Sequence, residues 1–234
     1  MRVQLAAVSI GMITAAGANP PQAGITPFAA HYQAEWRNIN VGTSDLELKP
    51  GDDPAHYVYT WTITAHGIFR MMYRDDLIQK SWFALRDNHV QPVKYTAVDG
   101  PSTAELEFDW EAGRAHGTTE KKSVDLTLKE GTQDVMSIQV EVMIDLKHDN
   151  LPKIFQIVDR DAVKEFIYQQ EGTAKISTAL GPLDTVIVSS HRTGSNRVLK
   201  MWFAPSLGYV PVQAERERDG KLEFAMRIKS LRLR

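Results

Sequence analysis

Apolar and polar residues alternate along most of the chain from about residue 30 to the C-terminus. In residues 57–64, Tyr57, Tyr59, Trp61 and Ile63 alternate with valine and threonine. Successive side chains of a strand point to opposite faces, so a period of two rich in aromatic and β-branched residues predicts a strand. Residues 105–111 alternate apolar with acidic positions, which predicts a strand with one buried and one solvated face.

The same alternation predicts further strands, and turn residues separate them. Asp219-Gly220 lies between the last two and is a strong hairpin signal. The remaining predicted strands cover residues 30–37, 41–48, 77–86, 93–98, 124–128, 163–171, 173–179, 183–192, 196–203, 209–217 and 221–230.

One segment departs from this period. Between residues 134 and 147 the apolar side chains fall at helical spacings. Asp134 stands at the start and is predicted to act as the N-cap, where its carboxylate would accept a hydrogen bond from a free backbone N–H. A chain of many short strands with one helix predicts a mostly β fold: a curved antiparallel sheet, or a half-open or closed β-barrel, with the helix packed on it or plugging it.

The N-terminus has the pattern of a secretory signal peptide. Arg2 precedes a short apolar stretch, and Ala16-Gly17-Ala18 forms a cleavage site of the A-x-A type. We expect a signal peptide at 1–18, a proline-rich segment at 19–27 and a single β-rich domain at 28–234. Export through such a signal predicts a periplasmic protein. No apolar stretch is long enough for a membrane span, and the absence of cysteine excludes disulfides and a lipid anchor on cysteine.

Charge and motif spacing exclude several kinds of chemistry. A formal net charge of −2 gives no basic surface for nucleic acid. The seven histidines form no metal-ligand spacing, and no catalytic motif is present. We therefore expect no metal, no cofactor and no enzyme. The acidic row Glu105, Glu107, Asp109 and Glu111 resembles the carboxylates of a glycosidase, but a solvated strand face explains it better because catalytic pairs need a desolvated pocket.

Ligand contacts are expected from an apolar cluster that begins after the strand at 57–64. Adjacent methionines there adapt to irregular apolar shapes, although the same residues could simply fill a core. Arginines in the run 215–218 could bind an anionic head group, although salt bridges across a hairpin are the simpler explanation. The candidate ligand-binding residues are Tyr59, Trp61, Phe69, Met71, Met72, Tyr73, Trp82, Phe83, Arg216 and Arg218.

A second aromatic segment, 202–212, is expected to be structural. Pro205 should end one strand, residues 206–208 should reverse the chain, and Pro211 should lie at a bulge or face away from the neighbouring strand. Trp202 and Tyr209 would then pack together across the hairpin.

Several segments together resemble the bacterial envelope family catalogued as domain of unknown function 3108. The likeness covers about residues 28–231 and rests on the order and spacing of GIFRMMYRDD (67–76), LEFDWEAG (106–113), GTQDVMS (131–137), GPLDT (181–185), WFAP (202–205) and YVPV (209–212). The resemblance implies an exported β protein of Gram-negative bacteria. It implies no catalytic residue, because the family's function is not established.

Two functions follow from these expectations, in order. The first is a periplasmic binding or carrier protein for an apolar or amphipathic, lipid-like ligand. The second is an envelope assembly module that docks a protein partner without a small ligand. An enzyme acting on polysaccharide is a distant third.

Overall fold

The computed structural model describes residues 24–53 and 55–234. The predicted signal peptide (1–18) and residues 19–23 of the proline-rich segment lie outside the described residues. The strands are β1 (Phe28–Trp36), β2 (Ile39–Pro50), β3 (His56–Ala65), β4 (Leu77–Arg86), β5 (His89–Asp99), β6 (Ser102–Asp109), β7 (Arg114–Thr119), β8 (Lys122–Thr127), β9 (Gln133–Asp134), β10 (Ile154–Asp159), β11 (Ala162–Thr178), β12 (Gly181–Arg192), β13 (Arg197–Ala204), β14 (Val210–Arg218) and β15 (Lys221–Leu233). The helices are α1 (Ile68–Met72), α2 (Ser137–Lys147) and the 3-10 turn η1 (Pro205–Leu207).

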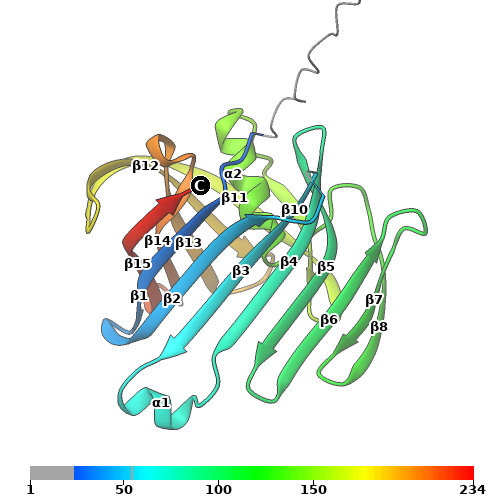
Figure 1. Ribbon diagram of the computed structural model, residues 1–234, viewed down its shortest axis with the longest axis horizontal. Helices are drawn as coiled ribbons and strands as arrows, with labels where there is room; N and C mark the ends of the chain where they lie inside the picture. The colour runs from blue at the N-terminus through cyan, green and yellow to red at the C-terminus, as the bar shows by residue number, and fades with distance from the viewer. Residues whose placement is uncertain (1–23, 54) are drawn as a thin grey trace, which may run out of the picture.

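The fifteen strands of the described residues belong to one curved sheet (Figure 1), in the order β8-β7-β6-β5-β4-β3-β2-β1-β15-β14-β13-β12-β11-β10-β9. Neighbouring strands pair antiparallel except β9 and β10, which pair parallel. The first and last strands, β1 and β15, pair in the middle of the sheet. The predicted fold class is confirmed: the protein is mostly β, with an open, curved antiparallel sheet and one packed helix.

Tight two-residue turns join many of the strands, because the backbone conformation of these turns fits the twist of a hairpin. Arg37-Asn38, Asp87-Asn88, Glu120-Lys121 and Asp219-Gly220 all have both residues at positive φ. This is the pattern of a type I′ turn, whose twist matches that of the flanking strands. The hairpin predicted at Asp219-Gly220 is confirmed, with strand ends at Arg218 and Lys221.

Some predicted elements need correction. The strands expected at 163–171 and 173–179 are one strand, β11, in which a register shift between Gln170 and Gly172 absorbs the break in pattern. Strands β7, β9 and β10 were not predicted. β7 reads RAHGTT, with two small residues and little apolar alternation, so neighbouring strands rather than its own side chains define it. The short helix α1 was also not predicted.

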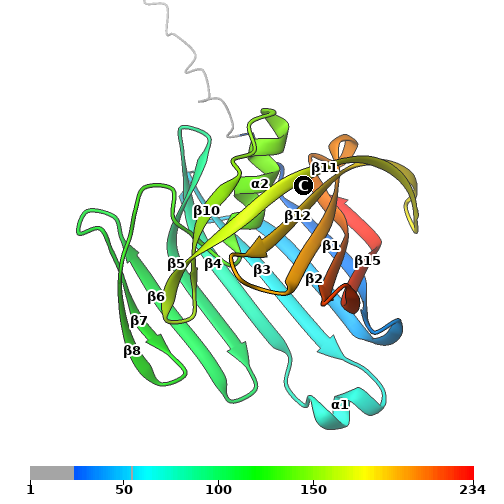
Figure 2. The same cartoon turned by 180° about the vertical axis from the view of Figure 1, so that it is seen from behind.

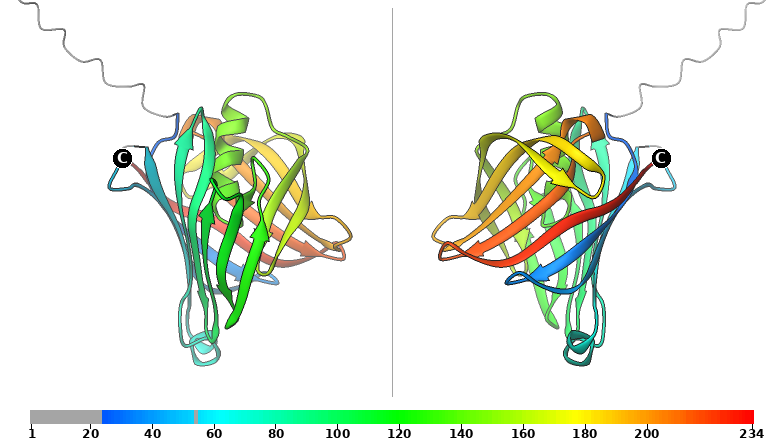
Figure 3. Two further views of the ribbon diagram at one scale, coloured as in Figure 1. Left: turned by 90° about the vertical axis from the view of Figure 1, so that its right-hand side faces the viewer. Right: turned by 90° about the vertical axis from the view of Figure 1, so that its left-hand side faces the viewer.

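Helix α2 lies inside the curve of the sheet, between its two flanks (Figures 2 and 3). It contacts β4, β5 and β9. Nine of its eleven residues are buried, including Val140, Val142 and Met143. A helix buried on nearly all sides has no need of a polar face. The predicted packing of this helix on the sheet is confirmed. Among the described residues no helix is both long and apolar enough to cross a membrane.

The predicted N-cap was placed two residues too early. The N-cap is Met136, and Asp134 belongs to β9. The Asp134 carboxylate nevertheless accepts hydrogen bonds from the backbone N–H groups of Met136 (2.7 Å) and Ser137 (2.8 Å), and from the Ser81 hydroxyl (2.6 Å). It therefore satisfies the free donors at the start of α2 from outside the helix and ties the helix to β4.

Asp134 should make stability depend on pH. Burial outweighs its hydrogen bonds and raises the pKa of Asp134 from 3.8 to about 6. A group whose pKa is raised by folding contributes stability that is fully present below its pKa in the unfolded chain. This contribution is lost as the pH rises through its pKa in the folded protein. Relative to Asp134→Asn, we expect wild type to lose about 2–3 kcal/mol of unfolding free energy between pH 4 and 7, at about 1.4 kcal/mol per pKa unit. Urea titrations of both proteins measure this difference, and parallel pH profiles would contradict it.

The segment around Trp202 confirms the predicted turn but not the predicted ring pair. β13 ends at Ala204, η1 reverses the chain, and a register shift after Trp202 accommodates Pro211. The aromatic pairs found among the described residues do not include Trp202 with Tyr209. The reason is register: Trp202 lies opposite Gln213, whereas Tyr209 lies in the turn before β14 with φ of 61°.

Candidate functional site

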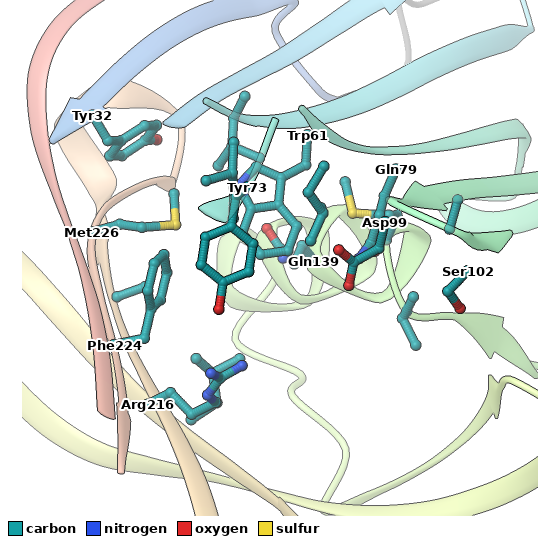
Figure 4. A pocket seen from close by; sticks show the side chains of 18 of the residues that line it. Tyr32, Trp61, Tyr73, Gln79, Asp99, Ser102, Gln139, Arg216, Phe224 and Met226 are labelled. Atoms are coloured by element: carbon teal, nitrogen blue, oxygen red, sulfur yellow. The ribbon is translucent and has the colours of Figure 1, made fainter. Parts of the chain in front are cut away.

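A cavity of about 810 Å³ lies between the concave face of the sheet and the start of α2. Strands β1–β6 form one wall and β13–β15 form the other. Helix α1 lies at the mouth. In Figure 4, Tyr32, Met226 and Phe224 lie along one side, Asp99 and Ser102 lie along the other, and Arg216 points into the space between.

The walls of this cavity are mostly apolar because the inward positions of the alternating strands converge there. Strand curvature turns one face of each strand toward the helix, and the apolar residues occupy that face. The apolar lining includes Leu46, Trp61, Ile63, Ala97, Ala104, Leu199, Met201, Phe224 and Met226.

Several polar side chains of the inner walls are paired within the protein. The Tyr32 hydroxyl donates to the Pro211 carbonyl (2.7 Å), and the Trp61 indole N–H donates to the Ser44 hydroxyl (2.7 Å). The Tyr95 hydroxyl donates to Gln79 Oε1 (3.2 Å). Burial raises the pKa of Tyr32 and of Tyr95 above the usual range, so both phenols stay neutral donors. These bonds fix the wall side chains, and a preformed cavity needs little ordering when it binds a ligand.

The mouth is formed partly by the apolar segment around α1. Phe69, Met72 and Tyr73 line the cavity. Ile68, Met71 and Met72 are also 70%, 77% and 72% exposed, which is unusual for large apolar side chains. Residues 68–73 therefore form an apolar lip at the mouth, and its methionine side chains can adapt to the shape of a bound molecule.

A second cavity of about 460 Å³ adjoins the first and has a different character. The two share lining residues, among them Gln139, Met201 and Arg216. The lining of the second cavity holds one carboxylate, Asp159, which pairs with Lys164 at 2.8 Å. Its five positively charged lining residues are Arg160, Lys164, Arg192, Arg197 and Arg216. The apolar cavity thus continues into a basic one.

Three arginines near this junction approach the same carboxylate, Glu223. Arg197, Arg216 and Arg218 all approach Glu223, at 3.5, 3.4 and 4.0 Å. Glu223 thus has three arginine neighbours, of which Arg218 also lies 4.0 Å from Asp219. Arg216 also lies over the Phe224 ring, 5.8 Å from its centroid, which holds it at the cavity wall.

The structure brings together half of the residues proposed from sequence. Trp61, Phe69, Met72, Tyr73 and Arg216 all line the large cavity. The other five are not part of its lining.

Two of those five are core residues. Tyr59 and Phe83 are fully buried; Phe83 stacks on Tyr57, and the Tyr59 hydroxyl donates to Gln139 Oε1 (3.0 Å). Trp82 is half-buried and pairs in register with Val58 and Lys94. Met71 and Arg218 are exposed and are not part of the cavity lining.

Sequence reasoning missed much of the lining, including Tyr32, Leu46, Gln79, Tyr95, Ala97, Leu199, Met201, Phe224 and Met226. Their alternation marked them as one face of a strand. Only the curvature of the sheet distinguishes a face that lines a cavity from one that packs in the core.

The acidic row of β6 forms a solvated face, as expected. Glu105, Glu107 and Asp109 are exposed. Lys94 pairs with Glu105 and approaches Glu107 (4.0 Å), and His116 lies 3.8 Å from Glu107. These carboxylates lie in water with cationic neighbours, unlike the desolvated pair that glycoside hydrolysis requires.

The fold and the site define a β protein whose single curved sheet surrounds a helix and an apolar cavity. The chain belongs to the family described as "Protein of unknown function (DUF3108)", which it matches over residues 31–225. This confirms the resemblance drawn from the sequence motifs. No curated protein matches the sequence.

Two solved structures of bacterial proteins are similar to this chain. One is a "putative lipoprotein" of Parabacteroides distasonis, with 10% identity, a TM-score of 0.37, and coverage of 89% of this chain and 96% of that chain. Another is a "putative exported protein" of Bacteroides fragilis with a YmcC-like fold, with 9% identity, a TM-score of 0.34, and coverage of 91% and 97%. Likeness at this level carries no argument about function.

Proposed function

We propose that this protein is a non-enzymatic carrier that binds an amphipathic molecule with one apolar chain and an anionic head group. The observation that carries the proposal is the junction of the two cavities: a mostly apolar space of about 810 Å³ opens into a smaller one with five basic side chains and one carboxylate. An apolar chain would occupy the first, and its head group would lie beside Arg216.

The size and the lining support this class of ligand. Small-molecule sites in proteins usually measure about 300–1,000 Å³, with apolar walls and a few polar groups that set orientation. Apolar burial would supply most of the affinity, at about 25 cal/mol per Å² removed from water. Arginine would supply selectivity, because its planar fork of N–H donors matches carboxylate and phosphate oxygens.

A periplasmic location is part of the proposal. The signal-peptide pattern at residues 1–18 supports export, and an apolar molecule that crosses an aqueous compartment needs a binding site that shields it from water.

The head-group part of the proposal is tested with two ligands that differ only in charge. Wild type should bind a fluorescent fatty acid more tightly than the matching fatty alcohol. Arg216→Gln should weaken binding of the acid about 3- to 10-fold and leave the alcohol unchanged, since a half-exposed charge pair contributes about 1 kcal/mol. Fluorescence titrations measure both affinities.

Arg114→Gln is the matched control, because Arg114 is an exposed arginine on β7 that pairs with Asp125 (2.6 Å) away from both cavities. Equal affinities of wild type for acid and alcohol, or equal losses in the two variants, would contradict the assigned role of Arg216.

The exposed apolar lip favours a second candidate, an assembly module that docks an envelope protein. Met71 is 77% exposed and is not part of the cavity lining. Met71→Asp should therefore leave fatty acid binding intact in a carrier. If wild type binds no amphiphile, the docking function becomes the better account of this lip.

A further inference from the structure

A cluster of three potential metal ligands lies outside both cavities, where α2 meets the start of β5. Glu141 and Asp145 stand one turn apart on α2, and His89 is the first residue of β5. One ligand atom from each lies within 4.8 Å of the other two. None of the three lines either cavity, so the cluster is separate from the proposed carrier site.

Burial makes this cluster unusual. Glu141 and Asp145 are only 5% and 3% exposed. Carboxylates are almost never so buried without a partner, because removing a charge from water is costly. Two like charges at positions i and i+4 of a helix also repel each other.

The protein's own hydrogen bonds satisfy only one of the two carboxylates. Glu141 Oε1 pairs with His89 Nδ1 (2.8 Å), and Glu141 Oε2 accepts from the Val90 backbone N–H (2.6 Å). Asp145 Oδ2 is buried and has no hydrogen-bond partner among the described residues. A buried acceptor without a partner requires an explanation, and a cation bound beside it is one.

We propose that His89, Glu141 and Asp145 bind a divalent transition-metal ion, with Zn²⁺ as the best fit. One imidazole nitrogen and two carboxylate oxygens suit Zn²⁺, and three protein ligands leave a fourth position for water. An imidazole ligand disfavours Mg²⁺ and Ca²⁺, which prefer oxygen alone. The charge of the ion would offset the two buried carboxylates and supply the missing partner of Asp145.

The position of the cluster determines how an ion would reach it and which elements metal binding would join. The His89 side chain is 66% exposed, so an ion can reach the site from solvent. Metal binding would join α2 to the β4–β5 hairpin and so stabilise the helix inside the sheet. Spacing along the chain did not reveal the site, because 52 residues separate His89 from Glu141.

Calorimetric titration of the metal-free protein with Zn²⁺ tests the proposal. We expect one equivalent to bind and to raise the melting temperature, with much weaker binding of Mg²⁺. Asp145→Asn and His89→Ala should each weaken Zn²⁺ binding at least about 10-fold, the loss typical of disturbing a metal site. Co²⁺ substitution should give a visible absorption band that both variants lose.

His31→Ala is the matched control: it removes a histidine that pairs with one carboxylate, Asp45 (2.7 Å), and should leave the binding unchanged. If Asp145→Asn fails to fold, the exposed His89→Ala decides alone. No Zn²⁺ binding by wild type, or binding that both cluster variants retain, would overturn the proposal.

Discussion

Ala97→Phe should weaken fatty acid binding about 10-fold or more, a loss of at least about 1.4 kcal/mol of binding free energy. Ala97 lies on β5 and lines the large cavity, in register with Gln79 on β4 and Ala104 on β6. Ala97 and Ala104 are both small, so they leave space into which a ring at position 97 would project. The new ring would occupy the volume of the ligand's apolar chain without removing any existing contact.

The adjacent residue supplies the control. Val98 is 43% exposed, and as the next residue on β5 it points to the opposite face of the strand. Val98→Phe adds a ring to the same strand and should leave binding unchanged. Melting temperatures of both variants would show that they fold. An Ala97→Phe protein that folds and binds normally would mean that the ligand does not use this cavity.

Trp202→Ala should lower the unfolding free energy by about 3–5 kcal/mol, the usual cost of truncating a large buried aromatic side chain. Trp202 is 9% exposed, and its register neighbours on β12 and β14 are Ile187 and Gln213. The absence of a ring pair with Tyr209 does not change this expectation, because the cost comes from lost packing around the indole.

Trp36→Ala is the comparison for this change. The Trp36 side chain is 44% exposed at the end of β1, so the same truncation should cost about 1 kcal/mol or less. Chemical denaturation of both variants measures the difference. Equal, small losses would show that the segment after β13 does not depend on the Trp202 indole.

Most of the fold could be predicted from the sequence, because strands and tight turns are encoded locally. The alternation in residues 57–64 gave β3, and Asp219-Gly220 gave the last hairpin. The errors in the predicted elements also come from local residues. β7 has too few apolar residues to show a period, and Asp134 has the chemistry of a cap although β9 positions it before the helix.

The candidate site could be predicted only in part, because it depends on contacts between distant residues. Phe69 and Met72 were found from their apolar cluster, whereas Tyr59 and Phe83 have the same composition but lie in the core. Alternation shows that a strand has two faces but does not show which face curves around an empty space. The cluster at His89 was missed for the same reason, since its ligands meet only in the folded chain.

The most direct test of the carrier proposal is native mass spectrometry of the protein purified from a Gram-negative periplasm. Wild type should carry a non-covalent mass that dissociates as an anionic amphiphile, and Ala97→Phe prepared in the same way should lack it. A wild-type protein that carries no such mass, and that also fails to bind added fatty acid, would contradict the proposal.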